Sequence, residues 1–283
     1  MSEANFISQK DAQELLGRTD VSFVDTSWYL PAQGRDGEAE FNKMRIPGAV
    51  FFDIDKVADT DTDLPHMLPT ASDFARQVSV LGISNDNLVV IYDGPGLFSA
   101  PRAWWTFKTM GAMDVRILEG GMDGWKEAGL PIETGNPNPP RARMFSAELA
   151  ADRVASQKMV LEAAASNSAV ILDARPNPRF LGKAPEPRAG LRSGHIPGSL
   201  SLPFGELMDD TSLKSPEALD KLFSELGVSG DQAVITTCGS GVTAAIISLA
   251  LAQSGRTNTK LYDGSWAEWG LPDGPEIEPD DSE

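Results

Sequence analysis

Ala233-Val-Ile-Thr-Thr-Cys-Gly-Ser-Gly-Val-Thr-Ala244 is the stretch that decides the fold of this 283-residue chain. Its apolar start is typical of a buried strand, and the glycines that follow predict a tight loop. The pattern from Val242 to about Gln253 then indicates a helix. Strand, loop and helix in this order are typical of α/β proteins.

The single cysteine of the chain, Cys238, ends the strand of this stretch. A thiol in this place lies above a helix N-terminus, among backbone N–H groups that have no intrahelical partner. Those donors and the helix dipole favour the thiolate, the nucleophilic form of cysteine. A buried core cysteine is the alternative, because free cysteines are often buried. The loop context favours a catalytic nucleophile.

The chain repeats itself at an offset of about 145 residues. Val89-Val-Ile-Tyr-Asp93 matches Val234-Ile-Thr-Thr-Cys238, so Asp93 stands where the second copy has its cysteine. Each of these strands follows a predicted helix, over 70–82 and 215–227 respectively. Further matches join 45–49 to 195–199 and 23–25 to 171–173. Two copies of one unit are therefore expected. Only the second copy has a sulfur nucleophile.

In each copy short apolar runs alternate with helical patterns. Strands are expected over 21–25, 49–52, 88–92, 115–118, 169–173, 199–202, 233–237 and 260–262. This alternation predicts an α/β fold, a tandem repeat of two domains that each have a parallel sheet with helices on both faces. The expected divisions are domains over 1–133 and 147–272, a Pro-rich linker over 134–146, and a solvated acidic tail over 273–283.

Composition excludes several classes of function. A formal charge of −17 opposes binding to nucleic acid or to anionic membranes. No apolar stretch approaches the roughly 18 residues of a membrane span, and the N-terminus lacks a signal pattern, so the cytoplasm is the expected compartment. One cysteine and two distant histidines make no metal site, and no phosphate-binding or dinucleotide motif follows a strand, so no cofactor is expected.

With these motifs in place, the chain resembles the two-domain rhodanese-type sulfurtransferases over nearly its whole length. The first half carries Tyr92-Asp-Gly and Ser99-Ala-Pro-Arg-Ala-Trp-Trp105. The second carries Arg179-Phe, Pro185-Glu-Pro-Arg188, Gly194-His-Ile-Pro-Gly198 and Leu261-Tyr-Asp-Gly-Ser-Trp-Ala-Glu-Trp-Gly270. The loop Cys238-Gly-Ser-Gly-Val-Thr243 resembles the 3-mercaptopyruvate branch, because the thiosulfate branch places cationic residues directly after the cysteine.

The charge of the loop supports that branch independently. Thiosulfate is a compact dianion that gains from positive charge beside the thiol. The neutral positions Gly239 and Ser240 suit a substrate whose charge lies farther away. The resemblance implies that Arg179 and Arg188 hold the carboxylate and keto end of mercaptopyruvate, as a guanidinium fork can. Surface ion pairs are the alternative for these two arginines.

The resemblance implies sulfur transfer in two halves. Cys238 takes sulfur from 3-mercaptopyruvate as a persulfide and releases pyruvate, and a thiol acceptor such as thioredoxin or glutathione, or cyanide, removes it. The amides of the loop, including those of Gly239, Gly241 and Val242, would stabilise the sulfur anion. Hydroxyls of Ser240 and Thr243 are expected to donate hydrogen bonds or relay a proton. Capping of the helix is the alternative for Thr243.

One position departs from the family pattern. Arg45 stands in Met44-Arg-Ile-Pro-Gly48, where the family has a histidine often assigned to a proton relay with the loop serine. An arginine stays protonated, so a third cation that orients the substrate is the role expected for it. His66 is expected mainly in loop packing, with a place in a cleft as the alternative. His195 is expected to serve a turn, and Asp173 and Arg175 to brace the loop.

Two other functions stay open. A thiosulfate:cyanide sulfurtransferase is the nearer alternative, distinguished by the charge of the loop. A persulfide carrier for a biosynthetic partner protein is the farther one, and the arginine pair speaks against it because a carrier needs no carboxylate clamp.

Overall fold

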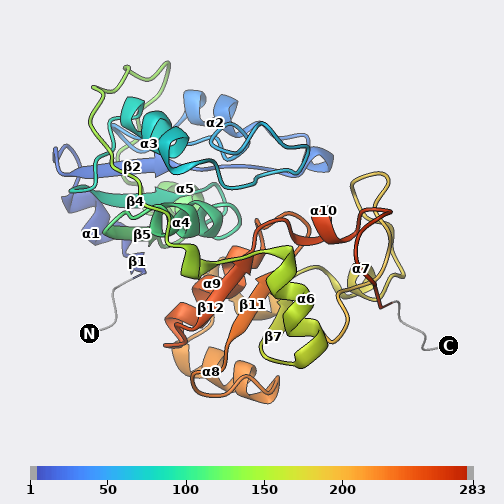
Figure 1. Ribbon diagram of the computed structural model, residues 1–283. Coiled ribbons are helices and arrows are strands. Elements are labelled where there is room, and N and C mark those ends of the chain that lie inside the picture. Colours follow the sequence, from blue (N-terminus) through green and yellow to red (C-terminus); the bar gives the residue numbers. More distant parts are fainter. Residues whose placement is uncertain (1–4, 279–283) are drawn as a thin grey trace. The chain divides into compact units, whose positions relative to one another are not determined.

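The computed structural model describes residues 5–278 of the chain, which divide into two compact units (Figure 1). The first unit comprises the chain up to Thr60, then Leu68–Ala150 and Asp210–Ser212. The second comprises Asp61–Met67, Ala151–Asp209 and the chain from Leu213. The short segment Asp61–Met67 is thus taken from the first half of the sequence into the second unit.

The first unit is built on a parallel five-stranded sheet in the order β1-β5-β4-β2-β3. Helices connect its strands, as parallel pairing requires. Its elements are β1 (Phe6–Ile7), α1 (Gln9–Glu14), β2 (Val21–Asp25), η1 (Pro31–Gln33), α2 (Gly37–Lys43), β3 (Val50–Phe51), α3 (Ala71–Val80), β4 (Leu88–Tyr92), α4 (Ala100–Thr109), β5 (Asp114–Leu118) and α5 (Gly121–Glu127).

The second unit repeats this sheet in the order β6-β12-β11-β7-β8, again parallel throughout. A two-stranded hairpin of β9 and β10 is added to it. Its elements are η2 (Ala151–Arg153), β6 (Val154–Ala155), α6 (Gln157–Ser166), β7 (Val170–Asp173), α7 (Asn177–Phe180), β8 (Leu200–Ser201), η3 (Phe204–Leu207), β9 (Met208–Asp209), β10 (Ser212–Leu213), α8 (Pro216–Glu225), β11 (Val234–Thr237), α9 (Ala244–Gln253), β12 (Thr259–Tyr262) and α10 (Ser265–Trp269).

Local sequence explains where the helices begin. Thr70 caps α3 by accepting a hydrogen bond from the Asp73 amide, and Ser215 caps α8 in the same way with Pro216 as the first helical residue. Helix α9 has no polar face, and its residues from Ala244 to Leu251 are buried, which is what an all-round apolar helix requires. The predicted α/β fold with two repeated parallel sheets is confirmed.

Equivalent backbone hydrogen bonds occur just beyond the strand ends of the two sheets. Asp25 O accepts from the Phe52 amide at 2.8 Å in the first unit, and Asp173 O accepts from the Leu202 amide at 2.9 Å in the second. Asp93 O accepts from the Met122 amide, and Cys238 O accepts from the Trp266 amide, both at 2.9 Å. Residue-by-residue equivalence between the units therefore holds at the carboxyl ends of the strands, where ligands of such sheets bind.

The tail was expected to be frayed, and this is wrong for the part that the structure describes, although its acidic side chains are exposed. Residues 273–278 pack against the second unit: Pro275 O accepts from Arg192, Glu276 O accepts from the Trp269 indole, and Glu278 forms a backbone bridge with His195. Ile277 packs against the core of this unit, which is the apolar contact that the acidic composition concealed. The rest of the predicted tail, 279–283, lies outside the described residues.

A bridge of this kind also closes the first unit. Arg45 and Glu133 pair through their backbones there, as His195 and Glu278 do in the second unit. Each glutamate carboxylate also accepts from a turn amide, that of Gly48 at 2.8 Å or that of Gly198 at 3.1 Å. Only in the first unit does a guanidinium join the pair, because Arg45 is fully buried and its Nη2 donates to Glu133.

This ion pair predicts a pH-dependent stability. The Gly48 amide and the Arg45 guanidinium together hold the pKa of Glu133 below its usual range despite partial burial. The stabilisation is therefore complete above the ordinary glutamate pKa of about 4.3 and is lost as the pH falls through the lowered value. We expect Glu133→Gln to lower the free energy of unfolding in urea at pH 7 by about 1–3 kcal/mol, and by less at pH 3.

Glu278→Gln is the matched control for this experiment. Its carboxylate occupies the equivalent bridge but is 56% exposed and faces His195 Nε2 at 3.8 Å instead of a buried guanidinium. A loss of stability as large as that of Glu133→Gln would contradict a special contribution from Arg45.

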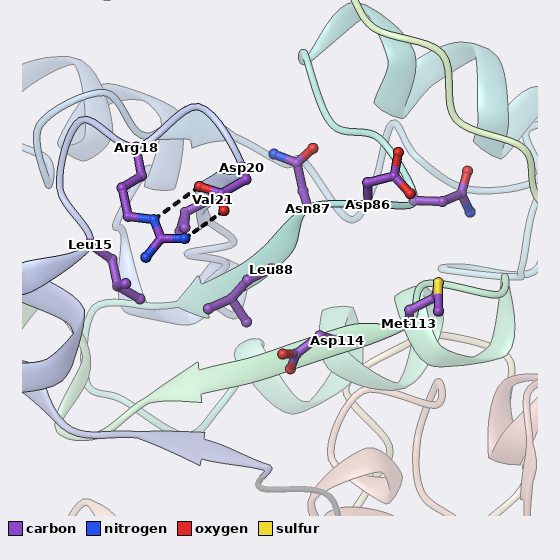
Figure 2. A pocket seen from close by; sticks show the side chains of 10 residues that line it. Leu15, Arg18, Asp20, Val21, Asp86, Asn87, Leu88, Met113 and Asp114 are labelled. Atoms are coloured by element: carbon purple, nitrogen blue, oxygen red, sulfur yellow. Dashed lines mark hydrogen bonds and ion pairs between the residues drawn. The ribbon is translucent and has the colours of Figure 1, made fainter.

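A cavity of about 480 Å³ opens at the amino ends of β2, β4 and β5 in the first unit. Its lining includes Asp86, Asn87, Met113 and the pair of Arg18 with Asp20, whose two hydrogen bonds Figure 2 shows. This cavity lies at the opposite end of the strands from Asp25 and Asp93.

Among the described residues, no helix has the length and apolar character needed to cross a membrane.

Candidate active site

Cys238 lies directly after β11, the strand flanked by β12 and β7 in the middle of its sheet. Its side chain is 2% exposed. The Cys238 amide donates to Ser265 Oγ at 3.3 Å, and its carbonyl oxygen accepts from the amide of Trp266. Both backbone groups are thereby tied to the start of α10, which fixes the direction in which the thiol leaves the strand.

Ser265 is a site residue that the sequence did not single out. It has a left-handed backbone with φ of 50°, uncommon for a residue other than glycine, and its hydroxyl also donates to Tyr262 O at 2.8 Å. The equivalent residue of the first unit is Gly121, with φ of 56°. The signal in the sequence was a serine at a repeat position where the first copy has a glycine with left-handed backbone.

The loop after the cysteine turns tightly around its own amides. Gly241 has φ of 77°, and Ser240 and Val242 are buried. Within residues 5–278, the amides of Gly239, Ser240, Val242 and Thr243 donate to no protein acceptor. Helix α9 begins at Ala244, two residues later than expected, with Thr243 at the N-cap position but without a capping hydrogen bond from its side chain. The capping alternative for Thr243 is therefore absent from this structure.

The first unit shows what such a loop does with an anion. Its Asp93 occupies the place of Cys238, and one carboxylate oxygen accepts from the amides of Phe98, Ser99 and Ala100 at 2.8 to 2.9 Å. The other oxygen accepts from the Gly96 amide. Asp93 is fully buried. The repeat thus holds a tethered negative charge in a ring of four backbone donors, a geometry suited to anions.

Arg179 lies against the catalytic loop. A Cβ added at Gly239 would come within 3.0 Å of Arg179 Nη2, so the glycine permits this close approach. The Arg179 guanidinium also donates to both carboxylate oxygens of Glu186, from Nε to Oε1 and from Nη2 to Oε2, and its side chain is 22% exposed. The arginine is ion-paired, as the alternative expected, and it also lies beside the loop. Carboxylate binding by Arg179 stays a prediction.

Glu186 connects Arg179 to a buried network. Its carboxylate, 2% exposed, also accepts from Arg175 Nη1 at 2.8 Å. Arg175 in turn pairs with Asp173, donates to Gly194 O at 2.9 Å and lies 4.1 Å over the Trp266 ring. Burial alone would lower the pKa of Arg175, but the two carboxylates outweigh it and raise that pKa. This network braces the loop region from the side of β7.

Arg188 lies next to His66. Their side-chain nitrogens, Nη2 and Nε2, are 3.5 Å apart, and both residues belong to the second unit. His66 is 6% exposed and has a left-handed backbone with φ of 62°, a strained conformation that clusters at functional sites. The sequence predicts mainly loop packing for this histidine and does not indicate its contact with Arg188, because a separation of 122 residues leaves no local pattern.

Arg45 is engaged inside the first unit. Beyond Glu133, its guanidinium donates to the carbonyl oxygens of Gly135 and Phe41 and lies 5.2 Å over the Phe41 ring. This packing gives the residue a structural role as the counterpart of His195, whose ring stacks on Phe180 at 3.9 Å. Arg45 thus crosslinks its own unit, and its expected role as a third cation for the substrate stays a prediction. No group of three or more His, Cys, Asp or Glu in the described part of the chain is placed to hold a metal ion.

Comparison with known proteins shows the family of the chain. The rhodanese-like domain family matches residues 8–128 and 156–271. The 3-mercaptopyruvate sulfurtransferase of Escherichia coli K12 is 42% identical over 280 residues, covering 99% of both chains, and that of Rattus norvegicus is 42% identical over 259 residues, covering 90% of this chain and 87% of its own.

Solved structures give the same result. SseA from Escherichia coli superposes with a TM-score of 0.85 at 40% identity, covering 93% of this chain and 99% of its own, and Tum1 from Saccharomyces cerevisiae with a TM-score of 0.88 at 33% identity, covering 99% of both. With a matched domain around Cys238 and another around Asp93, the chain belongs to the rhodanese family and carries two such domains in tandem.

Proposed function

We propose that this protein is a 3-mercaptopyruvate sulfurtransferase that works through a persulfide on Cys238. The observation that carries the proposal is the position of Arg179, whose guanidinium lies against Gly239 on a loop that has no charged side chain of its own. A carboxylate bound at that guanidinium places the rest of a small substrate over the loop. The relatives bearing this name cover almost the whole chain.

The first half-reaction transfers one sulfur atom. The Cys238 thiolate attacks the sulfur of 3-mercaptopyruvate, an S–S bond forms, and the carbon–sulfur bond breaks. The bonding electrons pass to the substrate carbon, giving the enolate of pyruvate, which takes up a proton and leaves. In the second half, an acceptor thiolate attacks the outer sulfur and restores the Cys238 thiolate, which predicts ping-pong kinetics.

The catalytic loop supplies electrostatic stabilisation. The four amides around the Asp93 carboxylate are the internal example of how such a loop holds negative charge. In the second unit the amides of residues 239 to 243 are the corresponding donors for the thiolate and for the outer sulfur of the persulfide. Fixed dipoles of this kind need no reorganisation during the reaction.

The proton for the enolate has three candidate sources. The hydroxyls of Ser240 and Thr243 belong to the loop itself, and His66 stands beside the second predicted substrate arginine, Arg188. Histidine is the side chain that most often transfers protons in enzymes, which favours His66 among the three. We assign it this role, with Ser240 as the hydroxyl that lies nearest to the cysteine in sequence. Arg45 as a substrate ligand stays a prediction.

Thiosulfate:cyanide transfer is the second candidate function. The absence of charge at Gly239, Ser240 and Gly241 disfavours it, since a dianion gains most from cations directly at the thiol. A persulfide carrier would not use Arg179. Thioredoxin, glutathione and cyanide are the proposed acceptors, and the cytoplasm, whose reducing conditions keep a single thiol free, is the proposed compartment.

Steady-state assays with the two donors test this function. We expect kcat/KM for 3-mercaptopyruvate, followed by pyruvate release with a thiol acceptor, to exceed that for thiosulfate by at least about 100-fold, a difference of about 2.7 kcal/mol in transition-state binding. Thiosulfate preference would assign the protein to the other branch. No turnover with either donor, together with persulfide exchange to a partner protein, would favour the carrier.

A further inference from the structure

The first unit contains a cavity of about 220 Å³ at the carboxyl ends of its strands. Asp25, at the end of β2, is 3% exposed and lines it. Within residues 5–278, no basic side chain pairs with this carboxylate. Burying a carboxylate without a cation costs free energy. The equivalent position of the second unit shows which cation can balance such a charge.

In the second unit, the equivalent of Asp25 is Asp173, and it does have a cation. The residue two positions later, Arg175, folds back on it, with its amide on Asp173 Oδ1 at 2.9 Å and its Nη2 on Oδ2 at 2.7 Å. In the first unit the same turn is present, with the amide of Ser27 on Asp25 Oδ1 at 2.9 Å. Ser27 therefore stands where Arg175 stands, and the guanidinium is missing.

The other groups that hold the Arg175 guanidinium also have counterparts around the cavity. The carbonyl oxygen of Gly194 accepts from Arg175. Gly194 directly precedes the bridge residue His195, and Met44 directly precedes the equivalent bridge residue Arg45, so Gly194 corresponds to Met44. The Trp266 ring beneath the guanidinium corresponds to the smaller Met122. Both Met44 and Met122 line the cavity.

The fourth partner, Glu186, corresponds in its contacts to Glu40. Glu186 pairs bidentately with Arg179 beside Gly239, and Glu40 pairs bidentately with Arg35, whose Nη2 lies 3.5 Å from a Cβ placed on Gly94. Glu40 also lines the cavity. In place of Arg175 Nη1, it accepts from Tyr29 Oη at 2.8 Å, which leaves Asp25 as the acceptor without a charged partner.

We propose that this cavity binds the guanidinium group of a small ligand, which takes in the first unit the place that the Arg175 side chain fills in the second. The guanidinium of the ligand pairs with Asp25, the buried carboxylate of the lining. The counterparts of every group around Arg175 surround the cavity, and the two substitutions that open it, Arg175 to Ser27 and Trp266 to Met122, both reduce side-chain volume. The site is independent of sulfur transfer.

The charges at the mouth are compatible with such a ligand. Arg35 pairs with Glu40 and Lys126 pairs with Asp123, and these four side chains are 40 to 50% exposed. Lys43, exposed at the rim, is suited to a ligand that also carries a carboxylate. L-Arginine combines both groups and is the natural probe, and L-citrulline is its neutral isostere.

Binding should depend on pH through Asp25. Burial, and to a smaller extent the nearby Asp93, raise the pKa of this carboxyl to about 7 against hydrogen bonds from Ser27. A cationic ligand binds the ionised form, so the affinity falls as the carboxyl is protonated. The charged or titratable groups around it come from three elements. They are Tyr92 at the end of β4 and Asp93 after it, Arg35, Glu40, Lys43 and Arg45 in and beside α2, and Asp123 and Lys126 on α5.

Isothermal titration of the full chain with L-arginine tests the proposal. We expect saturable binding at pH 8, about tenfold weaker binding at pH 6, and no binding of L-citrulline. Asp25→Asn should weaken L-arginine binding at pH 8 at least tenfold. Ser27→Arg supplies the guanidinium from within the chain and should abolish binding while leaving sulfur transfer unchanged.

If Asp25→Asn fails to fold, the Ser27→Arg variant still tests the proposal. We expect it to fold, because it adds to the first unit the arginine–aspartate pair that Arg175 and Asp173 form in the second. Equal binding of L-citrulline, or retained L-arginine binding by Ser27→Arg, would overturn the proposal. Binding of acetate in place of L-arginine would also overturn it and assign the cavity to anions held by Lys43 and Lys126.

Discussion

Replacing Cys238 by serine is expected to lower pyruvate release from 3-mercaptopyruvate by at least about 10³-fold, the scale on which enzymes lose activity with their nucleophile. A serine hydroxyl is not ionised near neutral pH, and no general base within the described residues contacts position 238 to activate it. The loop amides and Arg179 remain, so substrate binding should persist. Initial rates at saturating donor measure the loss directly.

Mass spectrometry of the intact protein separates this effect from unfolding. Because the chain has one cysteine, a mass gain of one sulfur atom after treatment with donor alone can arise only at Cys238. We expect that gain in the wild type and none in Cys238→Ser, with equal urea midpoints for the two proteins. Retained turnover in the serine variant, or a sulfur adduct on it, would remove Cys238 from the mechanism.

Arg179→Ala is expected to have the second largest effect. Loss of a charge-assisted bidentate contact is worth about 1.5–3 kcal/mol, so KM for 3-mercaptopyruvate should rise about 10- to 100-fold. KM for thiosulfate, which has no carboxylate, should change much less. Arg179→Lys should recover part of the loss, because an ammonium keeps the charge but not the fork.

Arg76→Ala is the matched control for this variant. Arg76 also pairs with a neighbouring carboxylate, that of Asp73, but its side chain is 71% exposed on α3. Both donors should be used by this control as by the wild type. If Arg179→Ala changed KM for the two donors equally, Arg179 would serve the stability of the Glu186 network and not the binding of a carboxylate.

The fold could be predicted because its signals are local and occur twice. The strand before Cys238 and the strand before Asp93 share one pattern, and each helix before them carries its own capping residue, Thr70 or Ser215. The repeat also located Asp93 as the counterpart of the cysteine. The repeat did not predict the four amides around the Asp93 carboxylate, because backbone N–H groups are the same for nearly all residue types and leave no pattern in a sequence.

The rest of the site depends on contacts between distant residues. The role of Arg45 follows from Glu133, 88 residues away, and that of His66 from Arg188, 122 residues away. Neither distance leaves a periodic pattern. The packed segment 273–278 was missed for a similar reason: its composition is acidic, but Glu278 completes a bridge to His195 that only the folded chain reveals.

The ring of amides around Asp93 has a consequence for the resting state of the enzyme. In the first domain, four oriented dipoles are neutralised permanently by a covalently attached carboxylate. On the proposed mechanism, the second domain reaches the same electrostatic balance only while its loop holds anionic sulfur. The thiolate before the first half-reaction and the persulfide after it both supply that charge, so the loop favours ionised over neutral sulfur at every stage of the cycle.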